Sequence, residues 1–368
     1  MLVATAGATD TPGMRLGHVP VLDAIRGIAI LLVLAVHADH RLPGGILGVD
    51  LFFVLSGFLI TSLLLTEWDR DGAVSLRSFY RRRALRLLPA LVVMLTVVTV
   101  VAAVTVEDFG SELVWSLYSL GYVINLAALG NGGIEAESLQ HMWSLSEEEQ
   151  FYLVWPLVLI VLLKTGVRSR RLALGLGVVA VALLVYRGTL GALGVSASYL
   201  LYAPESRSVG LVLGCLAGVV FSYGLVRRVP LLLATALLVP AGFAVAVVGL
   251  YGRSDAIVFL PLFCIAAAVV LLACALHPEW WFARLIDRGW LRGLGRISYG
   301  LYLWHIPIYL AVGWVAGLPL VILVALLSYR FVEQPFLRRR YRAVRGRQDA
   351  GPPAAEPLAA PAVQASSA

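Results

Sequence analysis

The feature that most constrains this chain is the repeated alternation of long apolar runs with short polar connections. A helix that crosses a membrane needs about 20 predominantly apolar residues, within a range of about 17–25. Of the 368 residues, 60% are hydrophobic and only 14% are charged, whereas a soluble domain is about half apolar and a quarter charged. We therefore predict an all-α polytopic membrane protein. Its candidate spans lie at residues 21–38, 46–67, 87–105, 115–129, 150–164, 172–187, 207–225, 230–250, 256–276, 297–314 and 316–333.

The basic residues indicate how these runs cross the membrane, because cytoplasmic loops carry an excess of lysine and arginine. If the chain starts in the cytoplasm and the short polar run 115–129 does not cross, every basic cluster falls on the cytoplasmic side. This predicts about ten transmembrane helices with both termini cytoplasmic, and an interfacial or re-entrant segment at 115–129. Topology then explains the net charge of +7, so we expect no nucleic-acid partner. The basic clusters lie at residues 77–86, 164–171, 227–228, 284–296 and 338–347.

We expect the membrane domain to fill residues 17–340, between two segments of different composition. Residues 1–16 contain no apolar run, so they are predicted to form an N-terminal cytoplasmic segment and not a signal peptide. Residues 341–368 include a run rich in proline and alanine and are predicted to be a disordered cytoplasmic tail. No appended soluble domain is expected.

The first apolar run carries one basic residue near each end, Arg26 and His37. On a helix the eleven steps between them make three turns plus about 20°, so both lie on one face, about 16 Å apart. Ionisable groups at membrane depth are costly and usually face a cavity or the bundle interior. In the alternative interpretation, Arg26 reaches a lipid headgroup and His37 sits at the far interface. The run alone leaves both interpretations open.

Three glutamates, residues 147–149, stand directly before an apolar helix that begins on the outer side of the predicted topology. Acidic side chains suit a helix start, so a solvated helix end accounts for one or two of them. A functional interpretation turns Glu148 inward, because Ser144, Glu148 and Tyr152 are spaced four apart and share one face. A carboxylate there can orient the imidazole of His37 and stabilise its charged form, which would make it an effective general base.

Five arginines between residues 77 and 86 satisfy the positive-inside rule, which is sufficient to explain them. Arg83 and Arg86 also share a helix face, so they can form a cytoplasmic seat for a phosphorylated ligand. Asp50 can pair with an arginine or lie at the outer interface, and the isolated His141 and His305 are typical of packing positions. No cluster has metal-ligand spacing, and the chain contains no phosphate loop and no Gly-x-Ser-x-Gly elbow.

Taken together, these segments resemble the acyltransferase-3 family of bacterial integral-membrane O-acyltransferases over about residues 17–340. The run LDAIRGIAILLVLAVH is similar to the family's motif of an arginine, ten residues and a histidine, and FYRRRALRLLPA to its paired arginines. The segment WSLSEEEQFYLVWP is similar to a third motif, in which Glu147 departs from the usual apolar residue while the spacing favours Glu148. Two later segments are also similar, RSVGLVLGCLAG from Arg207 and SYGLYLWHIPIY from Ser298.

The resemblance implies transfer of an acyl group, commonly acetyl, from cytosolic acyl-coenzyme A to a hydroxyl of a glycan, a glycolipid or a macrolide-type metabolite. It implies that Arg26, Arg83 and Arg86 hold the donor, that His37 is the general base and that Glu148 orients it. The oxyanion donor is left open between Ser144, Tyr152 and a helix terminus. The remaining supporting or substrate-binding roles would fall to Asp23, Asp50, Trp143, Ser144, Tyr152, Arg207, Tyr299 and His305.

The same resemblance implies a multi-pass protein of the inner (plasma) membrane, surrounded by bilayer lipid. Acyl-coenzyme A is a donor substrate in this scheme, and we expect no permanently bound cofactor and no metal. Oligomeric state is not specified. The main alternative function is a transporter or flippase of a lipid-linked sugar, which predicts Gly/Pro-broken helices in paired halves. A purely structural membrane protein is a further alternative, but it gives no role to a histidine and a carboxylate on one side of the membrane.

Overall fold

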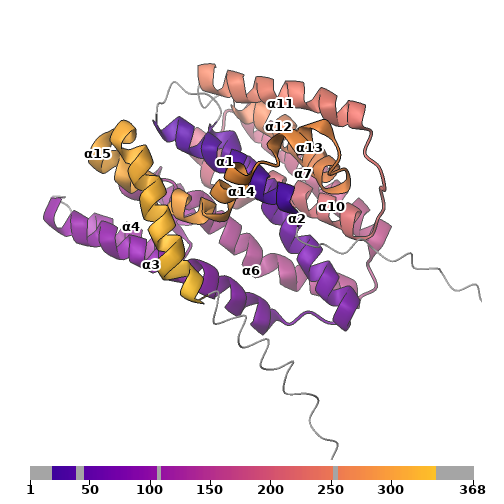
Figure 1. The fold of residues 1–368 in the computed structure, drawn as a ribbon, viewed down its shortest axis with the longest axis horizontal. Coiled ribbons are helices and arrows are strands. Elements are labelled where there is room, and N and C mark those ends of the chain that lie inside the picture. Colours follow the sequence, from indigo (N-terminus) through magenta and orange to yellow (C-terminus); the bar gives the residue numbers. More distant parts are fainter. Residues whose placement is uncertain (1–18, 39–44, 106–108, 252–255, 337–368) are drawn as a thin grey trace, which may run out of the picture.

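The computed structural model describes residues 19–38, 45–105, 109–251 and 256–336, and every regular element within these ranges is helical (Figure 1). The expected all-α fold is therefore confirmed for this part of the chain. The N-terminal segment 1–16 and the C-terminal segment 341–368 lie outside the described residues.

The long helices are separated by several short ones in chain order. The long elements are α1 (Pro20–Ala38), α2 (Gly45–Asp71), α3 (Leu76–Thr105), α6 (Met142–Lys164), α7 (Ser169–Ala192), α10 (Val209–Ser222), α11 (Leu231–Tyr251), α12 (Ala256–Leu276) and α15 (Ser298–Leu327). The short elements are α4 (Phe109–Leu120), α5 (Ile124–Asn131), α8 (Ala197–Tyr202), α9 (Pro204–Arg207), α13 (Trp281–Ile286) and α14 (Gly289–Arg296), with a 3₁₀ turn at Glu137–Leu139 and a π-helical turn at Ser328–Glu333.

Five helical segments among the described residues are long and apolar enough to cross a membrane. They are Pro20–Ala38, Ile46–Asp71, Leu76–Thr105, Ser169–Ala192 and Ser298–Phe336, and shorter apolar helices lie at Val209–Ser222, Leu231–Val245 and Leu260–Leu276. The chain is thus a helical protein with several membrane-length segments. The number of about ten spans and the cytoplasmic position of both termini stay predictions.

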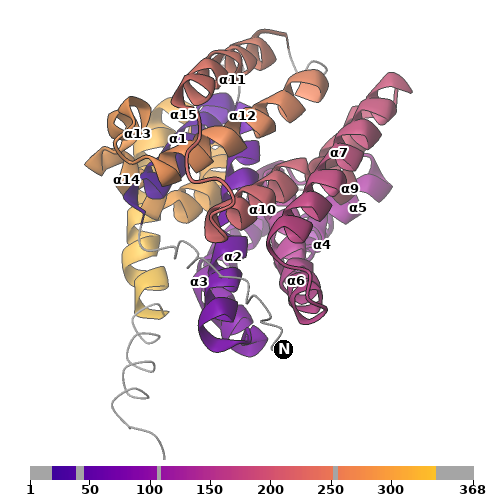
Figure 2. The same ribbon diagram turned by 90° about the vertical axis from the view of Figure 1, so that its right-hand side faces the viewer.

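Helices α2 and α10 pack at the centre of the bundle with their backbones in close contact (Figure 2). A Cβ atom on Gly57 would lie 2.0 Å from the carbonyl oxygen of Leu211, and one on Gly214 would lie 2.1 Å from that of Val54. Only glycine fits at either position, as is typical where membrane helices approach closely. This contact fixes the rotation of α2 and hence the direction of its polar residues.

The run 115–129 does not form one continuous helix. Helix α4 ends at Leu120, Tyr122 adopts a positive φ of 54°, and α5 begins at Ile124. Both pieces are shorter than a membrane span. This agrees with the expectation that the run does not cross.

The two last predicted runs, 297–314 and 316–333, form one apolar segment with a break between them. Within α15 the backbone of Gly313 is non-helical, with φ 72° and ψ 163°. A positive φ of this kind is readily adopted by glycine alone. The kink therefore coincides with the boundary predicted between the two runs.

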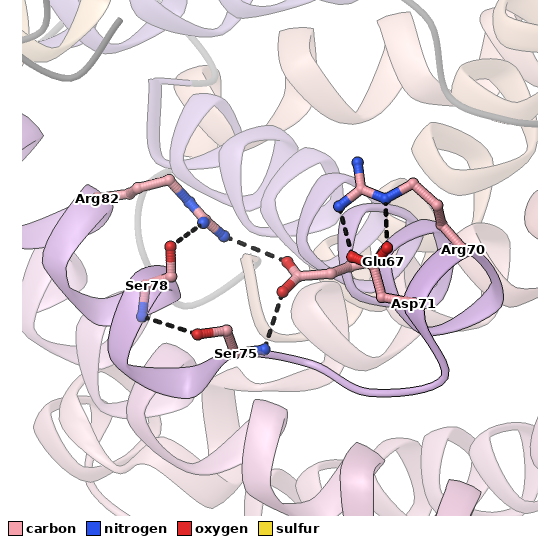
Figure 3. Close-up of polar contacts among 6 residues, drawn as sticks. All are labelled: Glu67, Arg70, Asp71, Ser75, Ser78 and Arg82. Carbon is pink, nitrogen blue, oxygen red and sulfur yellow. Dashed lines mark hydrogen bonds and ion pairs between the residues drawn. The ribbon is translucent and has the colours of Figure 1, made fainter. Parts of the chain in front are cut away.

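Helices α3 and α6 begin about two to three turns earlier than their apolar runs predicted, at Leu76 and Met142. The arginines of residues 77–86 therefore lie on a helix and not in a loop. Polar contacts at the α2–α3 connection fix the start of this helix (Figure 3). The Ser75 hydroxyl accepts a hydrogen bond from the Ser78 amide at 3.4 Å, and Glu67 accepts one from the Ser75 amide at 2.8 Å. Glu67 also pairs with Arg82 at 3.3 Å.

Candidate active site

A pocket of about 700 Å³, its open mouth included, lies between α1, α2, α3, α6 and α15. It collects side chains that are far apart in the sequence, and most of them are polar or aromatic. The lining residues predicted from the sequence are Arg26, Arg83, Arg86, Ser144, Glu148, Tyr152 and Tyr299. The pocket also contains residues that the sequence did not single out, chiefly Phe53, Ser56, Ser298 and Tyr302.

Arg83 is held by carboxylate and aromatic partners from α6. Its Nε donates to both carboxylate oxygens of Glu149 at 2.9 Å, and its Nη2 donates to Glu149 Oε1 at 2.5 Å. Its guanidinium also lies 3.2 Å from the centre of the Tyr152 ring. Nε and Nη2 of Arg83 are therefore both directed at a carboxylate of α6, and this residue braces α3 against α6.

Glu148 takes its partners from three helices, α2, α3 and its own helix α6, at the wall of the pocket. Its Oε1 accepts hydrogen bonds from the hydroxyls of Ser56 at 2.6 Å and Tyr152 at 2.8 Å. Arg83 Nη2 lies 3.6 Å from the same oxygen. This carboxylate is thus fixed at the arginine end of the pocket.

Arg26 and Arg86 face the pocket without a direct counter-ion. Neither makes a hydrogen bond or an ion pair with a residue that the structure describes, although Glu333 acts on Arg86 at longer range. Both guanidinium groups line the same pocket. Two unpaired arginines beside an open pocket form a site that favours an anion, because guanidinium groups match carboxylate and phosphate geometry.

The five arginines of residues 77–86 therefore have different surroundings. Arg82 pairs with Glu67 away from the pocket, and Arg83 pairs with Glu149. Arg77 and Arg81 are exposed. Only Arg86 combines a position in the pocket with the lack of a direct partner.

His37 lies outside the pocket lining, in a group of three histidines from α1, α15 and the N-cap of α6. The ring centres of His37 and His305 are 4.9 Å apart, and those of His305 and His141 are 5.0 Å apart. Tyr302 joins this group to the pocket, because it lines the pocket, contacts Ser144 at 2.5 Å and donates to the His141 carbonyl at 2.6 Å. The polar chain from the arginines to the histidines runs through this tyrosine.

The backbone fixes the tautomer of each of the three imidazoles. His37 Nδ1 lies 2.8 Å from the Val33 carbonyl oxygen, and His305 Nδ1 lies 2.6 Å from that of Tyr302. His141 Nε2 lies 3.2 Å from the carbonyl oxygen of Leu303. A carbonyl oxygen only accepts, so each of these nitrogens carries the hydrogen and the opposite nitrogen of the neutral ring carries the lone pair. His37 thus presents Nε2 as its basic atom.

A second polar region is sealed inside the bundle. Arg207 Nη2 lies 3.0 Å from Asp50 Oδ1, and their side chains are only 1% and 0% exposed. The Arg207 guanidinium lies 5.1 Å from the Trp143 ring centre and 5.9 Å from that of Phe53. Phe53 lines the pocket. Asp50, Trp143 and Arg207 therefore support the pocket wall from behind and do not line it.

Asp23 lies on α1, one turn before Arg26, where α1 meets α14 backbone to backbone. A Cβ atom on Gly295 would lie 1.8 Å from the carbonyl oxygen of Asp23. Asp23 is half-buried and does not line the pocket. Its position is consistent with a supporting role.

The predicted separation of the arginines and the glutamates to opposite sides is wrong. Arg83 and Glu149 are directly paired, and the Tyr80 hydroxyl donates to the Leu153 carbonyl at 2.8 Å. Both helices begin earlier than predicted, so α3 and α6 overlap at the depth of these charges. Arg26, Arg83 and Glu148 consequently share one pocket.

The contact expected between Glu148 and His37 is also replaced by others. Glu148 is bonded to Ser56 and Tyr152, whereas Val33 and His305 are among the partners of His37. Through His305, His37 lies near His141 at the N-cap of α6. His141 precedes Glu148 by seven residues, which is about two helical turns. One part of this arrangement has a signal in the sequence, because Tyr299, Tyr302 and His305 recur at three-residue steps and so share one face of α15.

Comparison with known proteins assigns most of the chain to one domain type. Residues 19–330 match the model of the acyltransferase-3 family, described as an acyltransferase domain. No solved structure matches the chain.

Several curated proteins are similar to the chain over most of its length. The peptidoglycan O-acetyltransferase OatA of Listeria monocytogenes is 30% identical over 355 residues, which cover 88% of this chain and 56% of that protein. YrhL of Bacillus subtilis, provisionally named a peptidoglycan O-acetyltransferase, is 33% identical over 364 residues, or 89% of this chain and 56% of YrhL. A provisionally named O-acetyltransferase of Staphylococcus aureus strain COL is 30% identical over an alignment of 385 positions. This alignment covers 93% of this chain and 61% of that protein. The chain thus spans somewhat more than half the length of these relatives.

Proposed function

The chain belongs to the acyltransferase-3 family, and from this premise we propose that it transfers an acetyl group from acyl-coenzyme A to a hydroxyl of a cell-envelope carbohydrate. Relatives named as peptidoglycan O-acetyltransferases support a glycan acceptor of this class. The membrane-length helices support catalysis within a membrane. We place the protein in the plasma membrane, with about ten spans and both termini in the cytoplasm.

The observation that carries the proposal is one pocket whose lining includes Arg26, Arg86, Ser144 and Tyr302. Coenzyme A is an anion with a long uncharged arm that ends in the thioester. The two unpaired guanidinium groups suit the charged part of the donor. The arm then extends between the aromatic walls toward Tyr302, beyond which the histidines lie.

His37 is the proposed general base. Its Nδ1 is committed to the Val33 carbonyl, so Nε2 takes the proton of the acceptor hydroxyl as the oxygen attacks the thioester carbonyl. The carbon–sulfur bond then breaks and coenzyme A leaves as a thiolate. The Tyr302 hydroxyl donates its one hydrogen to the His141 carbonyl, so Ser144, which contacts Tyr302, is the candidate to turn its hydroxyl toward the oxyanion.

The test is transfer of radiolabel from acetyl-coenzyme A to a cell-wall glycan preparation by the purified protein in lipid vesicles. We expect His37→Ala to lower the rate by about a hundredfold to ten-thousandfold, as is typical for loss of a general base. The matched control is His277→Ala, because His277 pairs with Glu279 outside the site and its loss should leave the rate unchanged. Transfer at the wild-type rate by His37→Ala would refute the mechanism. A transporter would instead move a lipid-linked sugar without forming a labelled ester.

A further inference from the structure

A shallow groove of about 1030 Å³, its open side included, runs along helix α7 and shares no lining residue with the candidate active site. Helix α7 lies at one flank of the bundle, beside α10 (Figure 2). The groove follows one helical face of α7 from Arg170 to Val181, and Leu225 borders it from the connection after α10. Its lining is apolar except for Arg170, which lies in the first turn of the helix.

The length of this groove matches one leaflet of a bilayer. The eleven residue steps from Arg170 to Val181 advance by about 16 Å along the helix, and half of a hydrocarbon core about 30 Å thick is about 15 Å. Because α7 is a membrane-length helix, Val181 lies near the midplane when Arg170 is at the level of the lipid headgroups. Leu174 and Val178, which line the groove, are 69% and 70% exposed, so this face suits an apolar chain.

Gly177 keeps the floor of the groove open. A Cβ atom at this position would meet no other atom within 4 Å, so the packing of helices does not require glycine here. A larger side chain at this position would therefore fill the groove without displacing a neighbouring helix. Gly175 faces equally open space but does not line the groove. The two glycines form a matched pair for testing whether the groove is used.

Exposed arginines stand in both segments that border the groove. Arg170 begins α7, and Arg227 and Arg228 follow Leu225 by two and three residues. All three arginines are exposed, and none makes a hydrogen bond or an ion pair with a residue that the structure describes. Their charges are therefore available to a ligand at the membrane surface.

The two bordering segments, residues 164–181 and 222–230, contain no acidic residue. The arginines thus have no counter-ion within their own segments, and phosphate is a group whose geometry guanidinium matches. Basic pockets between transmembrane helices on the cytoplasmic side bind anionic lipid headgroups. A groove one leaflet long, with an apolar body and unpaired arginines, is complementary to a phospholipid that carries a negative headgroup.

We propose that the groove along α7 binds one anionic phospholipid, with an acyl chain over Gly177 and the phosphate at Arg170 and Arg227. This site is separate from the acyl-transfer chemistry, and no bond is made or broken in it. A ligand that binds only the folded state stabilises that state. Bound lipid therefore stabilises the packing of α7 against α10.

The experiment titrates the purified full chain in neutral detergent with phosphatidylglycerol, or with phosphatidylcholine of the same acyl chains, and counts bound lipid by native mass spectrometry. We expect wild type to bind one phosphatidylglycerol at least about tenfold more tightly than phosphatidylcholine. Arg170→Ala/Arg227→Ala should raise the Kd for phosphatidylglycerol by about 25-fold, because each basic residue near an anionic surface contributes about fivefold. The matched control Arg77→Ala/Arg81→Ala also removes two exposed arginines and should leave this Kd unchanged.

A second pair of variants tests the apolar body of the groove. Gly177→Leu fills the groove and should raise the Kd for both lipids by about tenfold or more, whereas Gly175→Leu should bind both as wild type does. Added phosphatidylglycerol should raise the unfolding temperature of wild type and of Gly175→Leu, but not that of Gly177→Leu. None of these measurements uses acyl transfer, so their outcome is independent of the proposed function.

Four results would overturn the proposal. Equal affinity of wild type for the two lipids would mean that the groove holds lipid without selecting it. Competition by glycerol phosphate as strong as that by the whole lipid would assign the arginines to a free anion. A dimer that forms without lipid and is broken by Gly177→Leu would show that a second copy fills the groove. Unchanged affinity in both Arg170→Ala/Arg227→Ala and Gly177→Leu would place the lipid elsewhere.

Discussion

Glu147 and Glu148 are neighbours on α6, yet they belong to two polar regions of different character. Glu148 lies in the wall of the pocket with 19% of its side chain exposed. Glu147 is 1% exposed and lies within range of the Arg207 and Asp50 charges. One step along a helix turns the side chain by about 100°, so a single segment serves an open region and a sealed one.

The difference shows which charges are free to act on a ligand. In the open region Arg26 and Arg86 have no direct partner among the residues that the structure describes, and the pocket gives access to them. In the sealed region Arg207 and Asp50 pair at 3.0 Å behind Phe53 and Trp143. We therefore expect changes in the open region to alter catalysis and changes in the sealed region to alter stability.

The largest expected effect is on the stability of the sealed region. Arg207→Ala leaves Asp50 as a buried charge without its partner, which should lower the free energy of unfolding by about 3–5 kcal/mol. Thermal unfolding in detergent measures this change. The double variant Arg207→Met/Asp50→Leu should recover much of the loss, because an apolar pair of similar volume replaces a buried ion pair at little cost. Wild-type stability in Arg207→Ala would remove the distinction between the regions.

The next effect contrasts the two glutamates directly. Glu148→Gln weakens the hydrogen bonds from Ser56 and Tyr152, and bonds to a charged group are worth about 1.5–3 kcal/mol. We expect kcat/KM for acetyl-coenzyme A to fall by about tenfold to a hundredfold, with little change in unfolding temperature. Glu147→Gln should leave kcat/KM near wild type. The comparison would fail if Glu147→Gln gave the larger loss of activity.

A smaller effect is expected at the mouth of the pocket. Arg86→Ala removes one unpaired guanidinium and should raise the KM for acetyl-coenzyme A by about tenfold, which corresponds to about 1.4 kcal/mol, with kcat largely retained. Steady-state kinetics across donor concentrations checks this. A change confined to the KM of the glycan would place Arg86 on the acceptor side instead.

The smallest effect is expected at Arg82, four residues before Arg86. Its pair with Glu67 is partly exposed, and such pairs contribute about 0–1 kcal/mol. Arg82→Ala should therefore change the unfolding free energy by less than about 1 kcal/mol and leave the KM for acetyl-coenzyme A unchanged. If Arg82→Ala raised the KM for acetyl-coenzyme A as much as Arg86→Ala does, the donor would be attracted by the summed charge of residues 77–86 and not by Arg86 in particular.

The sequence was informative where helical spacing determines the answer. The length of the apolar runs predicted the helices, and four-residue steps placed Ser144, Glu148 and Tyr152 on one face, which the pocket confirms. The run 115–129 was predicted not to cross, but its division into α4 and α5 at Tyr122 was not predicted. The predicted features depend on local geometry, which the chain order specifies directly.

Contacts between helices could not be predicted in this way. The apolar runs placed the starts of α3 and α6 too late in the chain. The first turns of both helices carry charged residues, which a search for apolar runs leaves out even though partners from other helices neutralise them. Arg83 and Glu149 were consequently separated, and the pairing of Glu148 with Ser56 was missed. The meeting of His37, His305 and His141 depends on three distant segments, and single histidines gave no sign of it.

The most direct test of the account is the binding of coenzyme A itself to the purified full chain, measured by titration calorimetry. Wild type and Arg82→Ala should bind alike, whereas Arg26→Ala/Arg86→Ala should raise the Kd by about a hundredfold if each arginine contributes about 1.4 kcal/mol. The loss should be accompanied by a weaker dependence of binding on salt. Equal affinity in the double variant and the wild type would contradict the assignment of the open pocket to the donor.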